Sequence, residues 1–253
     1  MVKWPAYVTA DATYPQSLHQ EATANDAMTK NHNRSHRSGS WLPFAALNLR
    51  RNPFGELTTK DRIMLTVADI RPWLPMVQQP LQALQFIGRS GSGKSSHLLA
   101  IYAKLPAASY LFLPENGPLP EISPGSPWII DEAQRLPRRM RHRVFSSTLP
   151  VVLATHTNLQ RPLQRYGYQV TTVNAESLIQ PARLLQIFQR RIDAARLDPD
   201  LPSCRITATD VHWLIQHYGA DVRGMEYYLY KRVQENAGKP CVGGLCVELR
   251  FID

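Results

Sequence analysis

The stretch Leu84-Gln85-Phe86-Ile87-Gly88-Arg89-Ser90-Gly91-Ser92-Gly93-Lys94-Ser95-Ser96 decides the fold. Its apolar first part is typical of a β-strand that ends at Ile87, and the residues from His97 to Tyr102 favour a helix. Between them the pattern Gly-x-x-x-x-Gly-Lys-Ser is the phosphate-binding loop pattern, in the strand–loop–helix context that it requires. The alternative is a Gly- and Ser-rich turn with a chance lysine, and the flanking strand and helix count against it.

These residue types suit the phosphates of a nucleotide. The glycines let backbone N–H groups turn inward around phosphate oxygens, and the helix N-terminus adds partial positive charge. We expect Lys94 to reach the β- and γ-phosphates and the Ser95 hydroxyl to bind Mg²⁺. The residues expected to bind the nucleotide are Gly88, Ser90, Gly91, Ser92, Gly93, Lys94, Ser95 and Ser96.

Two adjacent acids follow a second apolar run. Trp128-Ile129-Ile130 is continuous enough for a strand buried on both faces of a parallel sheet, and Asp131-Glu132 ends it. The carboxyl ends of such strands lie at the edge where open α/β sheets bind ligands. We expect Asp131 to support Mg²⁺ and Glu132 to polarise an attacking water, which makes Glu132 and Lys94 catalytic candidates. The alternative is a strand that ends in an acidic turn.

The rest of the chain predicts an α/β domain followed by helices. Further strands are expected over 109–114, 150–158 and 168–173, with a proline-rich linker over 115–127 that no helix fits. Helices are expected over 60–70, 135–146, 159–165, 182–197, 207–217 and 225–235. The domain boundaries follow as a polar tail over 1–40, a nucleotide-binding domain over 41–175, a helical domain over 176–236 and a tail over 237–253.

The composition of the chain indicates which partners and which cellular compartment to expect. The 253 residues carry a net charge of +9, which indicates either a polyanionic partner such as nucleic acid or a generally basic surface. No apolar run reaches the length of a membrane span, and the start of the chain lacks the apolar core of a secretion signal. We therefore expect a cytoplasmic protein without a membrane partner. Cys241 and Cys246 hold at most half a metal site and are expected to be reduced and incidental.

Two further segments leave alternatives open. The predicted helix over 135–146 is strongly basic and is either a solvated face or a nucleic-acid contact, and the same holds for the arginines near Arg34 and Arg37 in the tail. Pro53 and Phe54, ahead of the phosphate-binding loop, either pack on the nucleotide base or simply fix a turn.

The order of these motifs resembles that of the AAA+ ATPases from about Asn48 to Glu235. The resemblance implies a five-stranded parallel P-loop sheet with a small C-terminal helical lid, an ATPase activity with ATP and Mg²⁺, and assembly into a homo-oligomeric ring or filament. Ala154-Thr155-His156-Thr157-Asn158 stands where the family keeps the polar residue that senses the γ-phosphate, which makes Thr155 or Asn158 that residue.

The resemblance also implies roles for arginines. Gly219-Ala220-Asp221-Val222-Arg223 is similar to the lid motif whose arginine contacts the nucleotide, so Arg223 takes that role. The segment Leu159 to Tyr166 is similar to the one that supplies an arginine finger to a neighbouring subunit. Arg165 is the first candidate for the finger and Arg161 the second, and a plain surface position is the alternative for either.

Within the family, Asp131-Glu132-Ala133-Gln134 resembles the form in TnsC/TniB/MuB-type transposition regulators and ExeA-like ATPases. This implies an ATP/ADP-controlled switch that acts on double-stranded DNA, with target selection in transposition and a transposase partner as its narrower form. An ATPase adaptor that acts on a protein partner without DNA is the alternative, and a small-molecule kinase is a weaker third. One departure is that the proline-rich linker replaces the helix expected between the second and third strands, near which the family's DNA-facing loops lie.

Overall fold

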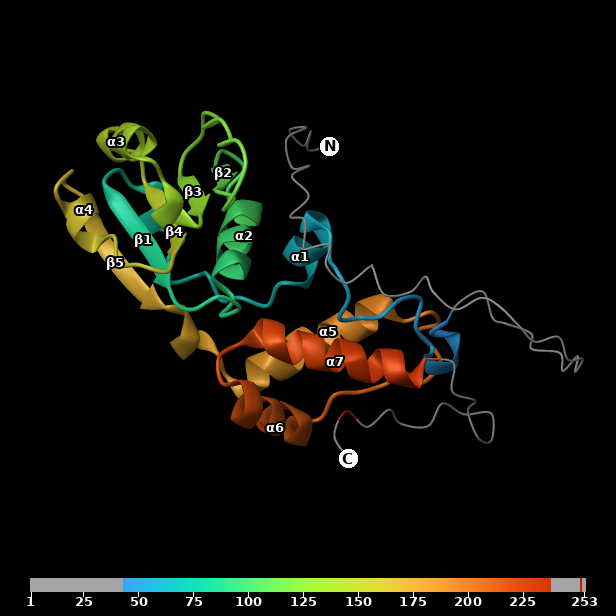
Figure 1. Ribbon diagram of the computed structural model, residues 1–253. Helices are drawn as coiled ribbons and strands as arrows, with labels where there is room; N and C mark the ends of the chain where they lie inside the picture. Colours follow the sequence, from blue (N-terminus) through green and yellow to red (C-terminus); the bar gives the residue numbers. More distant parts are fainter. Residues whose placement is uncertain (1–42, 238–250, 252–253) are drawn as a thin grey trace, which may run out of the picture. The chain divides into compact units, whose positions relative to one another are not determined.

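The computed structural model describes residues 43–237 and residue 251 (Figure 1). They form an α/β fold around a five-stranded sheet in the order β2-β3-β4-β1-β5, with every neighbouring pair parallel. The strands are β1 (Gln82–Ile87), β2 (Ser109–Phe112), β3 (Trp128–Asp131), β4 (Val151–Thr155) and β5 (Gln169–Asn174). This confirms the predicted α/β class with five parallel strands.

Helices cover both faces of the sheet, because its central strands are apolar on both faces. Leu84 and Phe86 of β1 pack with α2 (Lys94–Lys104), whereas Ala83 of the same strand faces the opposite side. That side is covered by α3 (Arg138–Ser146) and α4 (Gln160–Gln164), which bury Val144, Phe145 and Leu163 (Figure 1). The alternation of side chains along each strand therefore separates an α2 face from an α3–α4 face.

Three C-terminal helices share a separate core. They are α5 (Pro181–Ala195), α6 (Ala208–Tyr218) and α7 (Val222–Asn236), and their buried residues include Leu184, Leu214 and Leu229. Side chains fix where two of them begin: Thr207 and Asp210 form a capping box at α6, and Asp221 accepts a hydrogen bond from the Gly224 amide at the start of α7.

The segment ahead of α1 belongs to this helical core. Leu47, Leu49 and Phe54 are buried among the residues of α5 to α7. Asn48 fixes the segment, since its side-chain amide donates to the carbonyls of Asp198, Leu201 and Pro202. The helical core thus joins residues from both ends of the described chain.

Several elements differ from their predicted bounds. The helix α1 (Thr59–Leu65) has Thr58 as its cap but ends well before Ile70, since Thr66 is already extended. The basic segment is split, because Pro137 caps α3 and separates it from the short 3₁₀ helix η3 (Ala133–Arg135). Arg223 lies in the first turn of α7 rather than in a turn before it. The remaining 3₁₀ helices are η1 (Ala45–Leu47), η2 (Met76–Gln78) and η4 (Ala175–Leu178).

The proline-rich linker between β2 and β3 holds no helix, as predicted. The polar tail over 1–40 and the pair Cys241 and Cys246 lie outside the described residues, as does the C-terminal tail after residue 237 apart from Phe251. Among the helices that the structure describes, none combines the length and the apolar character needed to cross a bilayer.

Candidate nucleotide site

The loop between β1 and α2 turns back on itself at the carboxyl edge of the sheet. Gly91 and Gly93 have φ angles of 82° and 83°, a region that glycine enters without steric cost. The Ser92 hydroxyl donates to the Arg89 carbonyl at 2.9 Å, and the Arg89 amide donates to Glu176 at 3.1 Å. The loop is therefore fixed from within and from η4, while Ser90 and Ser96 remain exposed at its rim.

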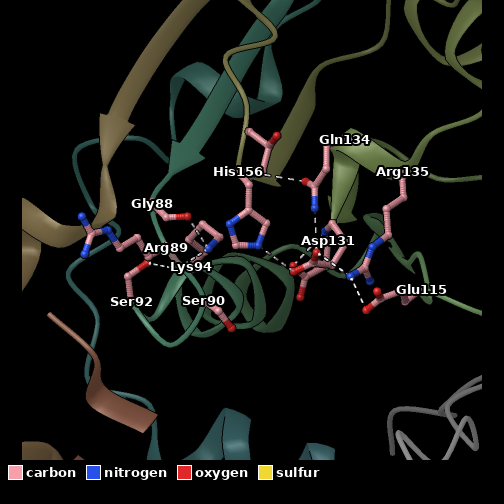
Figure 2. A network of polar contacts seen from close by, with 12 residues as sticks. Gly88, Arg89, Ser90, Ser92, Lys94, Glu115, Asp131, Gln134, Arg135 and His156 are labelled. Carbon is pink, nitrogen blue, oxygen red and sulfur yellow. Dashed lines mark hydrogen bonds and ion pairs between the residues drawn. The ribbon is translucent and has the colours of Figure 1, made fainter. Parts of the chain in front are cut away.

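Lys94 lies inside this loop. Its Nζ donates to the carbonyl oxygens of Gly88 and Arg89, at 2.8 and 2.6 Å (Figure 2). Only 5% of the residue is exposed, and this burial lowers the pKa of the Lys94 amine, while the charges of Glu132 and Asp131 oppose the shift. An anion at the loop would offer this ammonium group a charged acceptor in place of two carbonyls.

Asp131 ends β3 on the α2 face, which the strand periodicity dictates, since Ile129 two residues earlier packs against α2. Its carboxylate accepts hydrogen bonds from the Tyr110 hydroxyl and the Glu132 amide, both at 3.0 Å, and from the Ser95 hydroxyl. Burial raises the pKa of Asp131, and the bonds from Ser95 and Tyr110 act in the opposite direction.

Ser95 and Asp131 together fit a magnesium ion. Mg²⁺ prefers oxygen ligands and is usually held by one or two protein groups together with phosphate oxygens and water. The Ser95 hydroxyl lies near enough to the Asp131 carboxylate to lower its pKa. No group of three or more acidic, histidine or cysteine side chains gathers among the described residues.

Glu132 is held by three side chains, and its backbone has the left-handed angles φ 60° and ψ 40°. Gln134 Nε2 donates to Glu132 Oε2 at 2.7 Å, Arg135 lies 3.5 Å from the same oxygen, and His156 Nε2 lies 3.6 Å from Oε1. Left-handed angles are costly for a side chain of this size and gather at functional sites. The carboxylate thus points into a polar cluster beside the loop rather than into solvent.

Figure 2 shows that this cluster extends to the linker. The Gln134 side chain accepts from the His156 amide at 3.2 Å, and Arg135 donates to the Leu113 carbonyl and to Glu115. Arg135 therefore bridges the acid at the end of β3 and the start of the proline-rich segment.

The candidates for the γ-phosphate sensor are engaged elsewhere. The Thr155 hydroxyl donates to the Thr157 carbonyl at 2.8 Å, and Asn158 accepts from Gln85 at 2.9 Å. His156, between them, is the residue of this segment whose side chain reaches Glu132.

The first turn of α7 contacts the loop. Arg223 Nη1 donates to the Ser90 hydroxyl at 3.3 Å. A Cβ placed on Gly91 would lie 2.3 Å from Asp221 Oδ1 and 3.3 Å from the Arg223 Cβ, so only glycine allows this approach. The structure therefore brings the predicted lid arginine to the phosphate-binding loop.

Other predicted residues lie apart from the loop. Arg161 and Arg165 are exposed at the two ends of α4. Phe54 is 6% exposed, and its ring meets Phe188 and Phe251 edge-on at 6.0 and 6.1 Å. Pro53 is also buried, with its carbonyl bound by Arg191. Of the two alternatives for these residues, a structural role matches this position, and the base contact stays a prediction.

Sequence reasoning missed several neighbours of the loop. Tyr110 and His156 were not singled out, although a tyrosine within a buried strand and a histidine after one are polar groups that need partners. The apolar segment that adjoins the start of α2 comes after α1: Trp73 meets His97 edge-on at 6.2 Å, and His97 stacks on Phe86 at 5.1 Å.

Comparisons with known proteins add a distant likeness. No family model and no curated protein matches the sequence. Among solved structures, a chain of the structure of Drosophila ORC bound to DNA matches with 13% identity and a TM-score of 0.39. The match covers 84% of this chain and spans 65% of the length of that one. The fold assignment accordingly rests on the observed sheet, which fits a P-loop core, and on the loop that follows β1.

Proposed function

We propose that this chain is an AAA+ ATPase that binds ATP with Mg²⁺ and hydrolyses it to ADP and phosphate. One observation carries the proposal: Lys94 and Ser95 at the start of α2 and Asp131 and Glu132 at the end of β3 meet at one edge of the parallel sheet, although they are far apart in sequence. Phosphoryl transfer needs mainly positioning and charge, and these are the groups that supply both in P-loop enzymes.

Each residue has a distinct part in the proposed reaction. The loop amides and Lys94 hold the triphosphate, and Ser95 and Asp131 hold Mg²⁺, which would neutralise charge on the phosphates. Glu132 orients the water that attacks the γ-phosphate and accepts its proton. For this it exchanges its contact with Gln134 for the water, and Arg135 and His156 remain beside it to limit how far it moves.

Other residues couple the nucleotide to the rest of the protein. Arg223 of α7 contacts the phosphates of the bound nucleotide. In the structure described, it donates a hydrogen bond to Ser90 instead. Thr155, or Asn158 in the same turn, senses the γ-phosphate, and Arg165 or Arg161 of a neighbouring subunit completes the site in a homo-oligomer. Pro53 and Phe54 remain weaker candidates for contact with the base.

We infer that the ATP-bound oligomer acts on double-stranded DNA in the cytoplasm. The net charge of +9 and the exposed arginines of α3 support a polyanionic partner. Target selection in transposition, with a transposase as partner, is the narrower form of this proposal and rests on the resemblance of residues 131–134.

The experiment compares binding of a non-specific DNA duplex by the full chain with ATP, with ADP and without nucleotide. We expect binding that requires ATP and weakens with salt. Lys94→Ala, which removes the phosphate contact, should bind DNA alike in all three conditions. Binding that ignores the nucleotide in the wild type would contradict the switch, and an absence of DNA binding would favour the adaptor alternative.

A further inference from the structure

Two short helices on the α3–α4 face of the sheet present several exposed arginines. The sequence contains no Asp or Glu between Glu132 and Glu176, whereas this interval supplies Arg138, Arg139 and Arg143 from α3 and Arg161 and Arg165 from α4. All five are exposed. Within residues 43–237 and 251, none of them forms an ion pair with a carboxylate.

Aromatic contacts join the two helices into one surface. His142 Nδ1 lies 3.1 Å from the Tyr166 hydroxyl, and the two rings are 5.9 Å apart. Phe145 anchors Tyr166 from below, edge-on at 5.8 Å, and is itself fully buried against the sheet. Tyr166 keeps 37% of its surface exposed beside its contacts with His142 and Phe145 of α3. We call Arg138, Arg139, Arg143 and Tyr166 the α3–α4 surface, and Arg161 and Arg165, the finger candidates, flank it.

The charges of α3 reduce its own stability. Arg139 and Arg143 are four residues apart, so like charges face each other on one side of the helix. Arg138 and Arg139 lie in the first turn, where the helix dipole disfavours cations, and neither an acidic residue nor a side-chain cap compensates. Solvent exposure alone does not explain this unfavourable arrangement of charges, whereas a bound anionic partner would reduce the repulsion between them.

We propose that the α3–α4 surface binds the phosphodiester backbone of a nucleic acid. Guanidinium groups bind phosphate through two parallel hydrogen bonds, and an exposed aromatic ring among them offers a stacking surface or a hydroxyl donor. The site is separate from the nucleotide site, because Asp131 and α2 lie on the other face of the sheet. It rests on the proposed function only for the requirement that the partner is a nucleic acid.

The test compares two double variants of the full chain that lose the same charge. Arg139→Ala/Arg143→Ala removes two exposed arginines of the surface and leaves Arg161 and Arg165, the finger candidates, untouched. Arg62→Ala/Arg205→Ala removes two exposed arginines elsewhere. Equilibrium binding of duplex DNA, single-stranded DNA and duplex RNA is measured over a series of salt concentrations, with ATP present. The nucleic acid that binds most tightly identifies the type of partner whose phosphodiester backbone the surface binds.

Each phosphate contact contributes about 0.9 to the slope of log affinity against log salt concentration. The Arg139/Arg143 variant should therefore lose roughly 2 from this slope and bind about tenfold more weakly or worse, whereas the Arg62/Arg205 variant should stay near wild type. Equal losses in both variants, or none in either, would overturn the proposal. So would polyglutamate that competes as well as the nucleic acid at equal charge.

Two readouts separate this proposal from the proposed function. ATP hydrolysis without nucleic acid should be unchanged in Arg139→Ala/Arg143→Ala, and its thermal stability should equal or exceed that of the wild type, because alanine favours the helix. Suppose that the wild type binds nucleic acid and that the Arg139/Arg143 variant binds it with the same affinity as the Arg62/Arg205 variant. The proposed function then stands, and this surface is not the site. If the wild type hydrolyses ATP but binds no nucleic acid, the surface proposal and the proposed DNA role both fail. The proposed ATPase activity then stands.

Discussion

The hydroxyl group of Tyr110 on β2 donates a hydrogen bond to Asp131 Oδ2 on the neighbouring strand β3, at 3.0 Å. The bond stabilises the ionised carboxylate, and so it lowers the pKa of Asp131 against the effect of burial, which raises it. Tyr110 thereby favours the ionised form of the proposed magnesium ligand, which is the form that binds a cation.

Tyr110→Phe should raise the pKa of Asp131, because it removes one of the bonds that oppose the effect of burial. The acid limb of kcat/KM against pH should move to higher pH, and more Mg²⁺ should be needed for half-maximal activity. Tyr102→Phe removes a neighbouring hydroxyl, with the two rings 5.5 Å apart, and should leave the profile in place. Identical profiles for both variants and the wild type would refute a positioning role for Tyr110.

Asp131→Asn should stabilise the nucleotide-free protein at neutral pH. Because burial raises the pKa of Asp131 above its ordinary value of 3.8, the ionised form costs folding stability at any pH above the raised value. The gain from asparagine should shrink as the pH falls through that value and vanish below 3.8, where the carboxyl group is protonated in both the folded and the unfolded state. Thermal melts across this range measure the difference.

Asp61→Asn is the matched control, with the opposite sign. Hydrogen bonds from Thr58 at the start of α1 are the largest cause that lowers the pKa of Asp61, so its ionised form favours folding. This variant should lose stability at neutral pH, and the loss should fade as the pH falls through the lowered pKa. A stability loss of equal sign for Asp131→Asn would contradict the electrostatic account of the site.

Gly91→Ala should weaken nucleotide binding more than Gly93→Ala does. Both glycines have left-handed φ angles, which cost a larger residue about 1 to 2 kcal/mol. A methyl group at Gly93 meets nothing within 4 Å, whereas at Gly91 it would meet Asp221 at 2.3 Å and displace the start of α7. Titration calorimetry with ATP compares the two variants. Asp221→Ser, which is shorter and still caps the helix, should partly restore Gly91→Ala, and equal affinities of the two single variants would contradict the contact with α7.

Phe54→Leu separates the two roles considered for that residue. Its ring is buried between Phe188 and Phe251, with the Arg191 guanidinium 5.6 Å from its centre, so the smaller side chain should cost about 1 to 3 kcal/mol of folding free energy. ATP affinity measured well below the melting temperature should then equal that of the wild type. A drop in affinity without a loss of stability would instead support contact with the base.

The sequence predicts the sheet well because its signals are local. Continuous apolar runs such as Trp128-Ile129-Ile130 are found without knowledge of the rest of the chain, and the phosphate-binding loop follows from its residue spacing together with the strand and helix that flank it in sequence. The positions that escaped prediction depend on contacts distant in sequence. Phe54 is buried by α5 and by Phe251, and the side chains of Tyr110 and His156 gain their meaning only once β2, β3 and β4 lie next to each other.

The ends of the helices were the other feature that the sequence did not predict correctly. The helix predicted to reach Ile70 stops at Leu65, because Ile70 packs with the α2 face of the sheet instead of continuing an amphipathic stripe. The contacts of the Glu132 side chain also depend on its left-handed backbone angles, which the sequence Asp-Glu-Ala-Gln does not predict. Tertiary packing decides such positions over local preference.

The most direct test of the account is the turnover of ATP by Glu132→Gln, measured beside its affinity for ATP. The amide keeps the shape of the side chain but cannot accept the proton of the attacking water. We predict an affinity close to that of the wild type and hydrolysis lowered by about a hundredfold or more. Hydrolysis at the wild-type rate would contradict the assignment of Glu132 as the residue that activates water, and with it the proposed site.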